Sequence, residues 1–326
     1  MIVTVTPNPS IDRTVTLAGE LVRGAVHRVV SATSEPGGKG VNVARALTLA
    51  GIGTVAVLPA AEHDPILTGL KSIGVAFHAV PIGGTVRINL TVTEPDGTTT
   101  KINETGAVLA AADAQALERA VIRHARSARW VVLSGSLPPG LPDSWYSDMV
   151  AALRRYGCKV AVDTSDAPLA ALAADLERAA PDLVKPNAEE LAGLAGVTAE
   201  SLESAVARGD GGPVVRAARR LVERGVGTVL ATLGGAGAVL VDADGGWLAT
   251  PPPIRPRSTV GAGDSSLAGY LRAQTEGAGA PLRLQMAVAY GSGAAALPGS
   301  ALPAPAQINL HDVAVTSVWT RPEGEL

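Results

Sequence analysis

Apolar stretches of strand length alternate with amphipathic stretches of helix length along most of the chain. After residue 112 the apolar runs predict strands at 130–134, 159–163, 183–185 and 228–232, followed by a hairpin over 238–249. The amphipathic stretches predict helices at 112–127, 143–156, 167–178, 187–194, 213–224, 264–275 and 282–296. Apolar strands that alternate with such helices are typical of a mostly parallel central sheet flanked by helices on both faces. We therefore expect an α/β fold.

The N-terminal third combines this alternation with a second, β-rich pattern. A strand at 2–6, a helix at 43–50, a strand at 54–58 and a helix at 64–73 belong to the main layers. The other segments are short and β-like, at 15–17, 27–30, 77–80, 87–93 and 98–103, with a hairpin turn at Glu94-Pro-Asp-Gly97. They predict a small β-sheet from about 13–35 and 77–106 that lies outside the main layers as a lid. We expect residues 1–326 to form a single domain that carries this lid.

Composition and charge narrow the class of ligand. The chain has 326 residues, of which 47% are hydrophobic and 17% are charged, so it can bury a substantial core. The formal net charge is −3 and the Lys and Arg residues are scattered, which indicates no nucleic-acid partner. The single cysteine, Cys158, excludes an internal disulfide and a Cys-rich metal cluster. A small-molecule ligand is the expectation that remains.

The N-terminal sequence bears on the expected cellular compartment of the protein. The chain begins directly with a strand-like segment at 2–6 and lacks the basic and apolar regions of a signal peptide. No apolar run reaches the length that spans a membrane. We therefore expect a cytoplasmic protein with no membrane partner.

Two glycine-rich turns precede predicted helices and suit the binding of anions. Residues 37–42 are Gly-Gly-Lys-Gly-Val-Asn, and residues 258–264 are Ser-Thr-Val-Gly-Ala-Gly-Asp. A glycine turn lets a ligand approach the backbone, and the free N–H groups of a helix N-terminus favour negative charge there. Lys39 adds a cation to the first turn. Asp264 in the second turn allows two interpretations, a helix N-cap or a carboxylate that takes part in chemistry.

Several residues follow a predicted strand or begin a predicted helix. In an open parallel sheet the ligand lies beyond the carboxyl ends of the strands, so such residues can converge on one edge of the sheet. The residues that meet this condition are Asp12, Lys39, Asn187, Gly234, Gly235 and Asp264.

Two candidate groups also have a purely structural explanation. Asn187 and Glu190 have the spacing of a capping box, although Lys185 and Glu190 could serve nucleotide phosphates and hydrated magnesium. Arg87 and Asn89, taken as an isolated pair, are best explained as solvated residues of the lid. Neither His-Glu-x-x-His nor Gly-x-Ser-x-Gly occurs, which argues against a zinc enzyme and a serine hydrolase.

Five motifs, in this order, resemble those of the pfkB, or ribokinase-like, family of carbohydrate kinases. They are Thr6-Pro-Asn-Pro-Ser10 with Asp12, Gly37-Gly-Lys-Gly40-Val-Asn42, Ser134–Gly140, Lys185-Pro-Asn187-Ala-Glu-Glu190 and Ser258–Asp264. The resemblance extends over nearly the whole chain and implies a ribokinase-like α/β fold with a β-sheet lid. It also implies a phosphotransferase that uses ATP and Mg²⁺.

The resemblance gives each matching position a role. Asp264 would deprotonate the sugar hydroxyl, and the amides of Gly261, Ala262 and Gly263 would hold the charge of the transferring phosphoryl group. Substrate would be bound by Asp12, Gly38, Lys39, Asn42, Arg87 and Asn89, with Lys39 and Arg87 on its existing phosphate. The nucleotide would be bound by Lys185, Asn187, Thr232, Gly234, Gly235, Gly237, Gly261 and Gly263. Glu190 would hold magnesium through water.

The resemblance also indicates a phosphorylated ketohexose as substrate. Residues 37–42 together with 87–89 are most similar to the family members that phosphorylate fructose 1-phosphate at its 6-hydroxyl. Tagatose 6-phosphate and fructose 6-phosphate are alternative acceptors, and an inactive sensor of sugar and nucleotide is the alternative from another functional class. Where related phosphosugar kinases often have Asn-Glu-Pro-Gly, this chain has Thr105 in place of the proline, which leaves the local lid geometry open. A homodimer formed through the lid is a further expectation.

Overall fold

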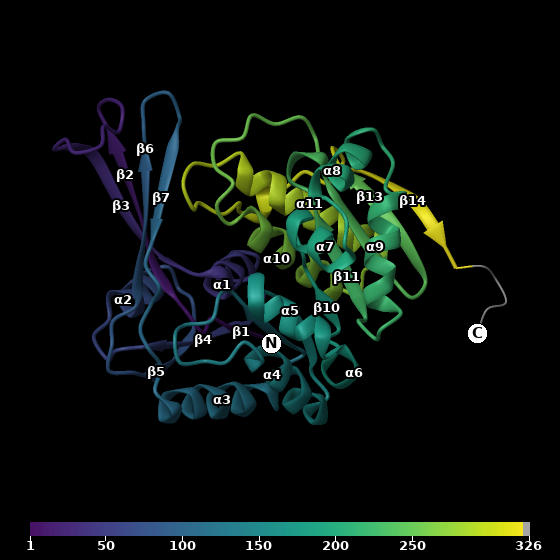
Figure 1. The fold of residues 1–326 in the computed structure, drawn as a ribbon, viewed down its shortest axis with the longest axis horizontal. Helices are drawn as coiled ribbons and strands as arrows, with labels where there is room; N and C mark the ends of the chain where they lie inside the picture. The colour runs from purple at the N-terminus through teal and green to yellow at the C-terminus, as the bar shows by residue number, and fades with distance from the viewer. Residues whose placement is uncertain (322–326) are drawn as a thin grey trace.

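The computed structural model describes residues 1–321, and within them the strands form two β-sheets (Figure 1). In spatial order, the large sheet consists of β14 (Ala314–Thr320), β13 (Gly245–Thr250), β12 (Ala238–Asp242), β11 (Thr228–Thr232), β10 (Leu183–Val184), β9 (Lys159–Asp163), β8 (Trp130–Ser134), β1 (Ile2–Val5), β4 (Thr54–Ala60) and β5 (Phe77–Pro81). The small sheet consists of β3 (Val29–Gly37), β2 (Ser10–Leu17), β6 (Arg87–Thr93) and β7 (Thr99–Asn103).

The large sheet is mostly parallel, as the alternation of strands and helices predicts. All pairs from β5 across to β11 are parallel, whereas β12, β13 and β14 extend the sheet in antiparallel order. β1 pairs with both β4 and β8 and therefore lies inside the sheet. The carboxyl ends of the parallel strands meet at one edge, which is where the predicted binding residues were expected.

Helices cover both faces of the large sheet (Figure 1). One face carries α1 (Lys39–Leu49), α2 (Pro65–Ser72), α10 (Ala262–Thr275) and α11 (Ala280–Ala295). The other carries α3 (Ala111–Ala125), α4 (Trp145–Leu153), α5 (Asp166–Ala174), α6 (Leu176–Ala179), α7 (Ala188–Ala195), α8 (Ala199–Ala207) and α9 (Gly212–Val222). Short 3₁₀ turns are η1 (Arg154–Tyr156), η2 (Gly234–Ala236) and η3 (Pro305–Gln307). Within residues 1–321, no helix has both the length and the apolar character needed to span a membrane.

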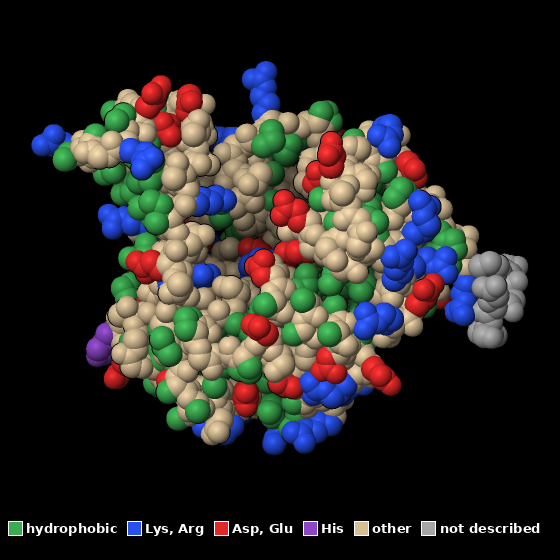
Figure 2. All heavy atoms as spheres, in the orientation of Figure 1, with side chains coloured by type: hydrophobic (Ala, Val, Ile, Leu, Met, Phe, Trp, Pro, Cys, Tyr) green, Lys and Arg blue, Asp and Glu red, His purple; other side chains and the backbone are tan. Residues whose placement is uncertain are grey.

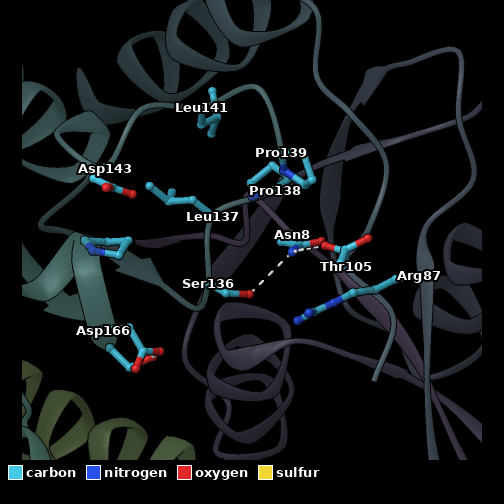
Figure 3. A pocket seen from close by; sticks show the side chains of 12 residues that line it. Asn8, Arg87, Thr105, Ser136, Leu137, Pro138, Pro139, Leu141, Asp143 and Asp166 are labelled. Atoms are coloured by element: carbon cyan, nitrogen blue, oxygen red, sulfur yellow. Dashed lines mark hydrogen bonds between the residues drawn. The ribbon is translucent and has the colours of Figure 1, made fainter. Parts of the chain in front are cut away.

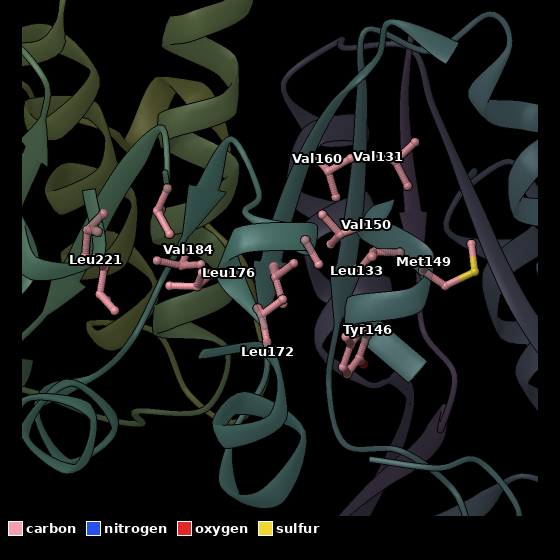
Figure 4. Packing of buried hydrophobic residues seen from close by; sticks show 14 of the residues in the cluster. Val131, Leu133, Tyr146, Met149, Val150, Val160, Leu172, Leu176, Val184 and Leu221 are labelled. Atoms are coloured by element: carbon pink, nitrogen blue, oxygen red, sulfur yellow. The ribbon is translucent and has the colours of Figure 1, made fainter. Parts of the chain in front are cut away.

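Side chains of each parallel strand alternate between two hydrophobic cores. Val131 and Leu133 of β8 pack with Met149 and Val150 of α4 on one face (Figure 4). Trp130 and its alternate neighbours on β8 face the core under α1, α10 and α11 instead. Burial on both faces explains why these strands are apolar throughout, and it holds the carboxyl edge of the sheet in a fixed position.

The small sheet is joined to the proline-rich segment at 6–9 and to the glycine turn that precedes α1. β2 begins five residues after β1 ends, and β3 leads into α1 through Gly38 alone. β2 pairs in parallel with β6, so that Asp12 lies opposite Asn89. Its other face carries a small apolar cluster that includes Val15 and Val92. The sheet stands beside the main layers (Figure 1), in the position expected of a lid.

One segment assigned to the lid from the sequence belongs elsewhere. Residues 77–80 form most of β5, which pairs in parallel with β4 at the edge of the large sheet. β5 follows α2 and completes an ordinary strand, helix and parallel strand unit, so the change from the main layers to the lid comes after it. The double glycine at 83 and 84 marks that change.

Candidate active site

A cavity of about 960 Å³ opens between the small sheet and the carboxyl edge of the large sheet (Figure 2). It is lined by nearly all of the predicted binding residues: Asp12, Gly38, Lys39, Asn42, Arg87, Asn89, Lys185, Asn187, Thr232, Gly234, Gly235, Gly237, Gly261, Ala262, Gly263 and Asp264. These residues come from both sheets and from the starts of α1, α7 and α10. Glu190 is absent from the lining, whereas its neighbour Glu189 contributes to it.

Asp264 lies in the first turn of α10 and does not cap that helix. The N-cap is Gly261, which has a φ of 74°, a left-handed conformation that favours glycine. Asp264 is buried, and its Oδ2 accepts a hydrogen bond of 2.9 Å from Asn42 Nδ2. Burial, and then the charge of Asp163, raise the pKa of Asp264 to about 6, against the opposing effect of Asn42 and two lysines. The carboxylate therefore faces the cavity as a stronger base than an ordinary Asp.

The amides of the same turn are not equivalent. The Ala262 N–H donates to the carbonyl of Thr259 at 3.3 Å, and that bond occupies one of the three amides assigned to the phosphoryl group. The N-terminus of α10 still presents its positive dipole end to the cavity.

Asp163 is a site residue that sequence reasoning missed. It ends β9 with a fully buried side chain, and Lys39 Nζ lies 2.9 Å from its Oδ1 while Lys185 Nζ lies 3.2 Å from its Oδ2. Burial acts to raise the pKa of Asp163, but the two ammonium groups outweigh it and hold that pKa below its ordinary value. In the same way, burial acts to lower the pKa of Lys39, and Asp163 outweighs it and raises that pKa. Both groups are therefore charged at neutral pH.

On the lid side, Asp12 and Asn89 present one polar surface. Asp12 Oδ1 accepts hydrogen bonds from Asn89 Nδ2 at 3.0 Å and from Ser10 Oγ at 2.7 Å. A Cβ at Gly37 would lie 2.2 Å from Asp12 Oδ2, so this position has no room for a side chain. Among the described residues, the buried Oδ1 atoms of Asn42 and Asn89 have no hydrogen-bond partner. Both residues line the cavity, and an amide side chain can exchange hydrogen bonds with hydroxyl groups of a ligand.

Arg87 lines the main cavity and also a second cavity of about 470 Å³, which Figure 3 shows. Its Nη1 donates to the carbonyl of Glu104 at 3.3 Å, but its buried Nε has no hydrogen-bond partner among the described residues. Burial lowers the pKa of Arg87, against the opposing charge of Asp12. A half-buried guanidinium that lines the cavity is suited to an anionic ligand.

The departure at Thr105 leaves the base of the lid well anchored. Asn8 Nδ2 donates to the Thr105 carbonyl at 3.0 Å and to Ser136 Oγ at 3.4 Å (Figure 3). Gly106 has a φ of 99°, and a Cβ there would lie 2.1 Å from Asn8 Oδ1. Backbone and glycine contacts, which need no proline at 105, therefore fix this loop.

The remaining wall is built from small residues after β11 and from the start of α7. Thr232 forms an isolated parallel bridge with Asn187, which brings the two segments together. Gly237 has a φ of 120°, and a Cβ there would lie 2.2 Å from the Ala249 carbonyl. Pro251, Pro252, Pro253, Ile254 and Pro256 add an apolar side to this part of the cavity. A flat apolar group such as a nucleotide base fits such a wall.

Asn187 and Glu190 form the capping box that their spacing predicts. Asn187 Oδ1 accepts from the Glu190 N–H, and Glu190 Oε2 accepts from the Asn187 N–H, both at 2.8 Å. Burial raises the pKa of Glu190, against that hydrogen bond and the nearby lysines. One carboxylate oxygen of Glu190 is therefore already engaged in the fold.

Comparisons with known proteins agree on one family. The profile of the pfkB family carbohydrate kinase matches residues 5–307. A 1-phosphofructokinase of Rhodobacter capsulatus is 36% identical over 311 residues, 94% of each chain, and that of Escherichia coli K12 is 34% identical over 292 residues, 88% of this chain and 89% of the relative. The structure of phosphofructokinase-2 from Escherichia coli in complex with substrates and products has a TM-score of 0.84 at 30% identity, covering 94% of this chain and 96% of that chain.

Proposed function

The chain belongs to the pfkB family of carbohydrate kinases, and on that basis we propose that it transfers the γ-phosphate of ATP to the 6-hydroxyl of D-fructose 1-phosphate. The product would be fructose 1,6-bisphosphate. Membership of a kinase family implies ATP as the phosphoryl donor. The relatives named 1-phosphofructokinase, at 34–36% identity, favour this acceptor over the other phosphorylated ketohexoses.

The juxtaposition of Asp264 and the α10 N-terminus is the observation that carries the proposal. A base must lie beside the attacked hydroxyl, and a source of positive potential must lie where charge accumulates on the phosphoryl group. Asp264 supplies the first and the turn at 261–263 the second, within one helical turn. Asp12, Asn42 and Asn89 would hold the sugar hydroxyls, because all three residues line the same cavity.

The phosphate already on the substrate would lie between Arg87 of the small sheet and Lys39 at the start of α1. Arg87 lines the cavity with its guanidinium, and Lys39, which also lines it, has a side chain that is 35% exposed. Because a phosphate is a strong acceptor with two negative charges, contact with these groups would favour a phosphorylated sugar over a free one. The same contacts make a nucleoside a poor acceptor.

Magnesium fits the site as a hydrated ion held with the nucleotide. Within residues 1–321, no group of three or more His, Cys, Asp or Glu side chains is arranged to hold a metal. Mg²⁺ commonly keeps several waters and is held by one or two carboxylates together with substrate phosphates. Glu190 would act through water, since one of its oxygens caps α7. The bound ion would neutralise charge on the ATP phosphates, while Lys185, Asn187 and the 232–237 segment position the nucleotide.

The proposed acceptor is tested by measuring ADP release with fructose 1-phosphate, fructose 6-phosphate, tagatose 6-phosphate and free fructose. We expect the highest kcat/KM with fructose 1-phosphate and little turnover of free fructose. Arg87→Gln should raise KM for the phosphorylated sugar about 10-fold or more, because it removes a buried charge contact to phosphate. Arg13→Gln, an exposed arginine on β2, is the matched control and should leave KM unchanged.

Two other outcomes would point to different functions. A higher kcat/KM with tagatose 6-phosphate or fructose 6-phosphate would replace the acceptor and keep the reaction. Binding of ATP and sugar without ADP release under any of these conditions would favour the sensor of sugar and nucleotide, and would reject the kinase.

We also propose that the lid assembles two copies of the chain. The face of the small sheet opposite Asp12 and Asn89 carries the exposed apolar side chains of Val29 and Ile102, by the register of its strands. Apolar residues on an exposed sheet face are typical of an interface. A related Escherichia coli phosphofructokinase-2 is described as tetrameric in its inhibited form.

A further inference from the structure

Asp163 is a fully buried carboxylate to which the proposed reaction has so far assigned no task. Its side chain has no exposed surface, and it lies at the carboxyl end of β9, at the edge of the sheet where the cavity opens. A buried charge is costly unless it is paired, and here the partners are Lys39 and Lys185. Both lysines line the cavity, whereas Asp163 lies behind them.

The two lysines reach Asp163 from separate elements. Lys39 is the first residue of α1, and Lys185 directly follows β10. Lys39 Nζ donates to Oδ1 at 2.9 Å, and Lys185 Nζ lies 3.2 Å from Oδ2, an oxygen that receives no well-aligned hydrogen bond. A lysine side chain has four rotatable bonds, so without an anchor its ammonium group occupies many positions. The Asp163 carboxylate therefore fixes the positions of both ammonium groups in the cavity.

The negative charge of Asp163 also raises the pKa of Asp264. The groups that act on Asp264 are Asp163 from β9, Asn42 and Lys39 from α1, and Lys185 after β10. Burial raises the pKa of Asp264 most, Asp163 adds to that rise, and the other three groups oppose it. Without Asp163, the charges of Lys39 and Lys185 would lower the pKa of Asp264, and Asp264 would be a weaker base.

We propose that Asp163 is a positioning residue of the phosphoryl-transfer reaction, which holds the ammonium groups of Lys39 and Lys185 in place and offsets their charge at Asp264. The inference rests on the proposed function in one respect, the assignment of Asp264 as the base. It does not depend on which phosphorylated sugar is the acceptor.

Asp163→Asn is the principal test, because asparagine has nearly the same shape and no charge. We expect kcat to fall roughly 10-fold or more, with a smaller change in KM for ATP. The acid limb of the pH profile of kcat/KM should move to lower pH by about one pH unit, since Asp264 loses a negative neighbour. Asp64→Asn is the matched control: Asp64 is buried and caps α2, so its loss should lower stability without moving the acid limb.

A second measurement separates this inference from the proposed function, because it needs no turnover. The Asp264 carboxyl carbon can be followed by NMR during a pH titration of ¹³C-labelled protein, with Asp264→Asn identifying the signal. We expect Asp163→Asn to move its titration to lower pH. Lys39→Met, which keeps Asp163 and removes one cation, should move it to higher pH.

The opposite signs of the two shifts are the decisive result. If Asp163→Asn does not fold, the upward shift in Lys39→Met still supports the inference and its absence overturns it. Loss of activity in Asp163→Asn with an unmoved acid limb and an unmoved titration would mean that Asp163 is only structural. Shifts of the expected signs in a protein that turns over none of the sugars would retain the inference and reject the proposed acceptor.

Discussion

At the scale of single residues, the Asp264 carboxylate is buried in the first turn of α10 and hydrogen-bonded to Asn42 rather than to its own helix. Helix N-termini stabilise a carboxylate, yet burial and the nearby charge of Asp163 act against the ionised form. The carboxylate therefore holds its proton more tightly than a surface Asp and is suited to accept one from a hydroxyl.

Asp264→Asn should lose most of its activity and keep its affinity for ATP. The amide has the same shape but cannot accept the hydroxyl proton, so kcat should fall by about 10²- to 10⁴-fold. ADP release measures the rate, and calorimetric titration with ATP measures the affinity. Near-normal turnover would remove the assignment of Asp264 as the base.

The same substitution should stabilise the fold at neutral pH. The pKa of Asp264 is raised from 3.8 to about 6, so the folded protein binds this proton more tightly than the unfolded chain. That contribution to stability is present below pH 3.8 and is lost as pH rises through about 6. Asp264→Asn should therefore gain about 1–3 kcal/mol in the free energy of unfolding at pH 7.5, and little at pH 4. Urea unfolding at both pH values measures this, and a variant less stable than the parent at pH 7.5 would contradict it.

Lys39→Ala should weaken binding of the phosphorylated acceptor specifically. Removal of one cation from the cavity should raise KM for fructose 1-phosphate about 10-fold, with a smaller effect on free fructose. Lys101→Ala, an exposed lysine on β7, is the control. Equal weakening of both sugars would show that Lys39 does not contact the acceptor phosphate.

The residues that the sequence indicated and that line the cavity carry a local signature, whereas Asp163 carries none and was not indicated. Lys39 and Asp264 each follow a glycine turn, so their neighbours in sequence identify them. Asp163 is the last residue of an ordinary apolar strand, and its partner Lys39 is 124 residues away. Only the pairing of β9 and β10 and the approach of α1 bring these charges together, and that information is tertiary.

At the scale of elements, the start of α7 has two tasks. Its capping box stabilises the helix, and its Glu190 is proposed to hold Mg²⁺ through water. The reciprocal hydrogen bonds of Asn187 and Glu190 close the first turn of the helix. Substitutions that keep these bonds can separate the two tasks.

Glu190→Gln should preserve the helix and weaken the dependence on magnesium. Glutamine also serves in a capping box, so thermal stability should change little. Loss of the charge should raise the Mg²⁺ concentration for half-maximal rate about 10-fold. A magnesium titration of the rate measures this, with Glu200→Gln on α8 as the control. An unchanged magnesium requirement would leave Glu190 with its capping role alone.

The alternation of strands and helices could be predicted from the sequence, but the sheet to which β5 belongs could not. Phe77 to Val80 has the same β-like composition as the lid strands, and composition does not say which sheet a strand joins. The parallel pairing with β4, set by the crossover through α2, decides it. The edge strand β14 was not expected either, because a seven-residue segment after a proline-rich loop carries a weak signal.

At the scale of the whole molecule, the lid has one polar and one apolar face. The polar face carries Asp12 and Asn89 at the cavity, and by strand register Val29 and Ile102 lie on the other face, 49% and 57% exposed. An isolated sheet of four strands gains stability if its apolar face is covered.

The protein should therefore sediment as a dimer, and charges on that face should dissociate it. The double variant Val29→Asp, Ile102→Asp places two carboxylates in the proposed interface, where burial of a charge is costly. Val108→Asp, at a residue 72% exposed and outside the small sheet, is the matched control. Analytical ultracentrifugation distinguishes the species, and a parent chain that stays monomeric at high concentration would reject lid pairing.

The inner position of β1 governs the order in which the chain can fold during synthesis. β1 leaves the ribosome before both of its neighbours, β4 and β8, and β8 ends only at Ser134. β2 likewise waits for β6, 77 residues later in register. Such distant pairings slow folding and leave apolar strands uncovered meanwhile. A nascent chain stalled before residue 130 would therefore expose Val3 and Val5 and depend on chaperones to stay free of aggregation.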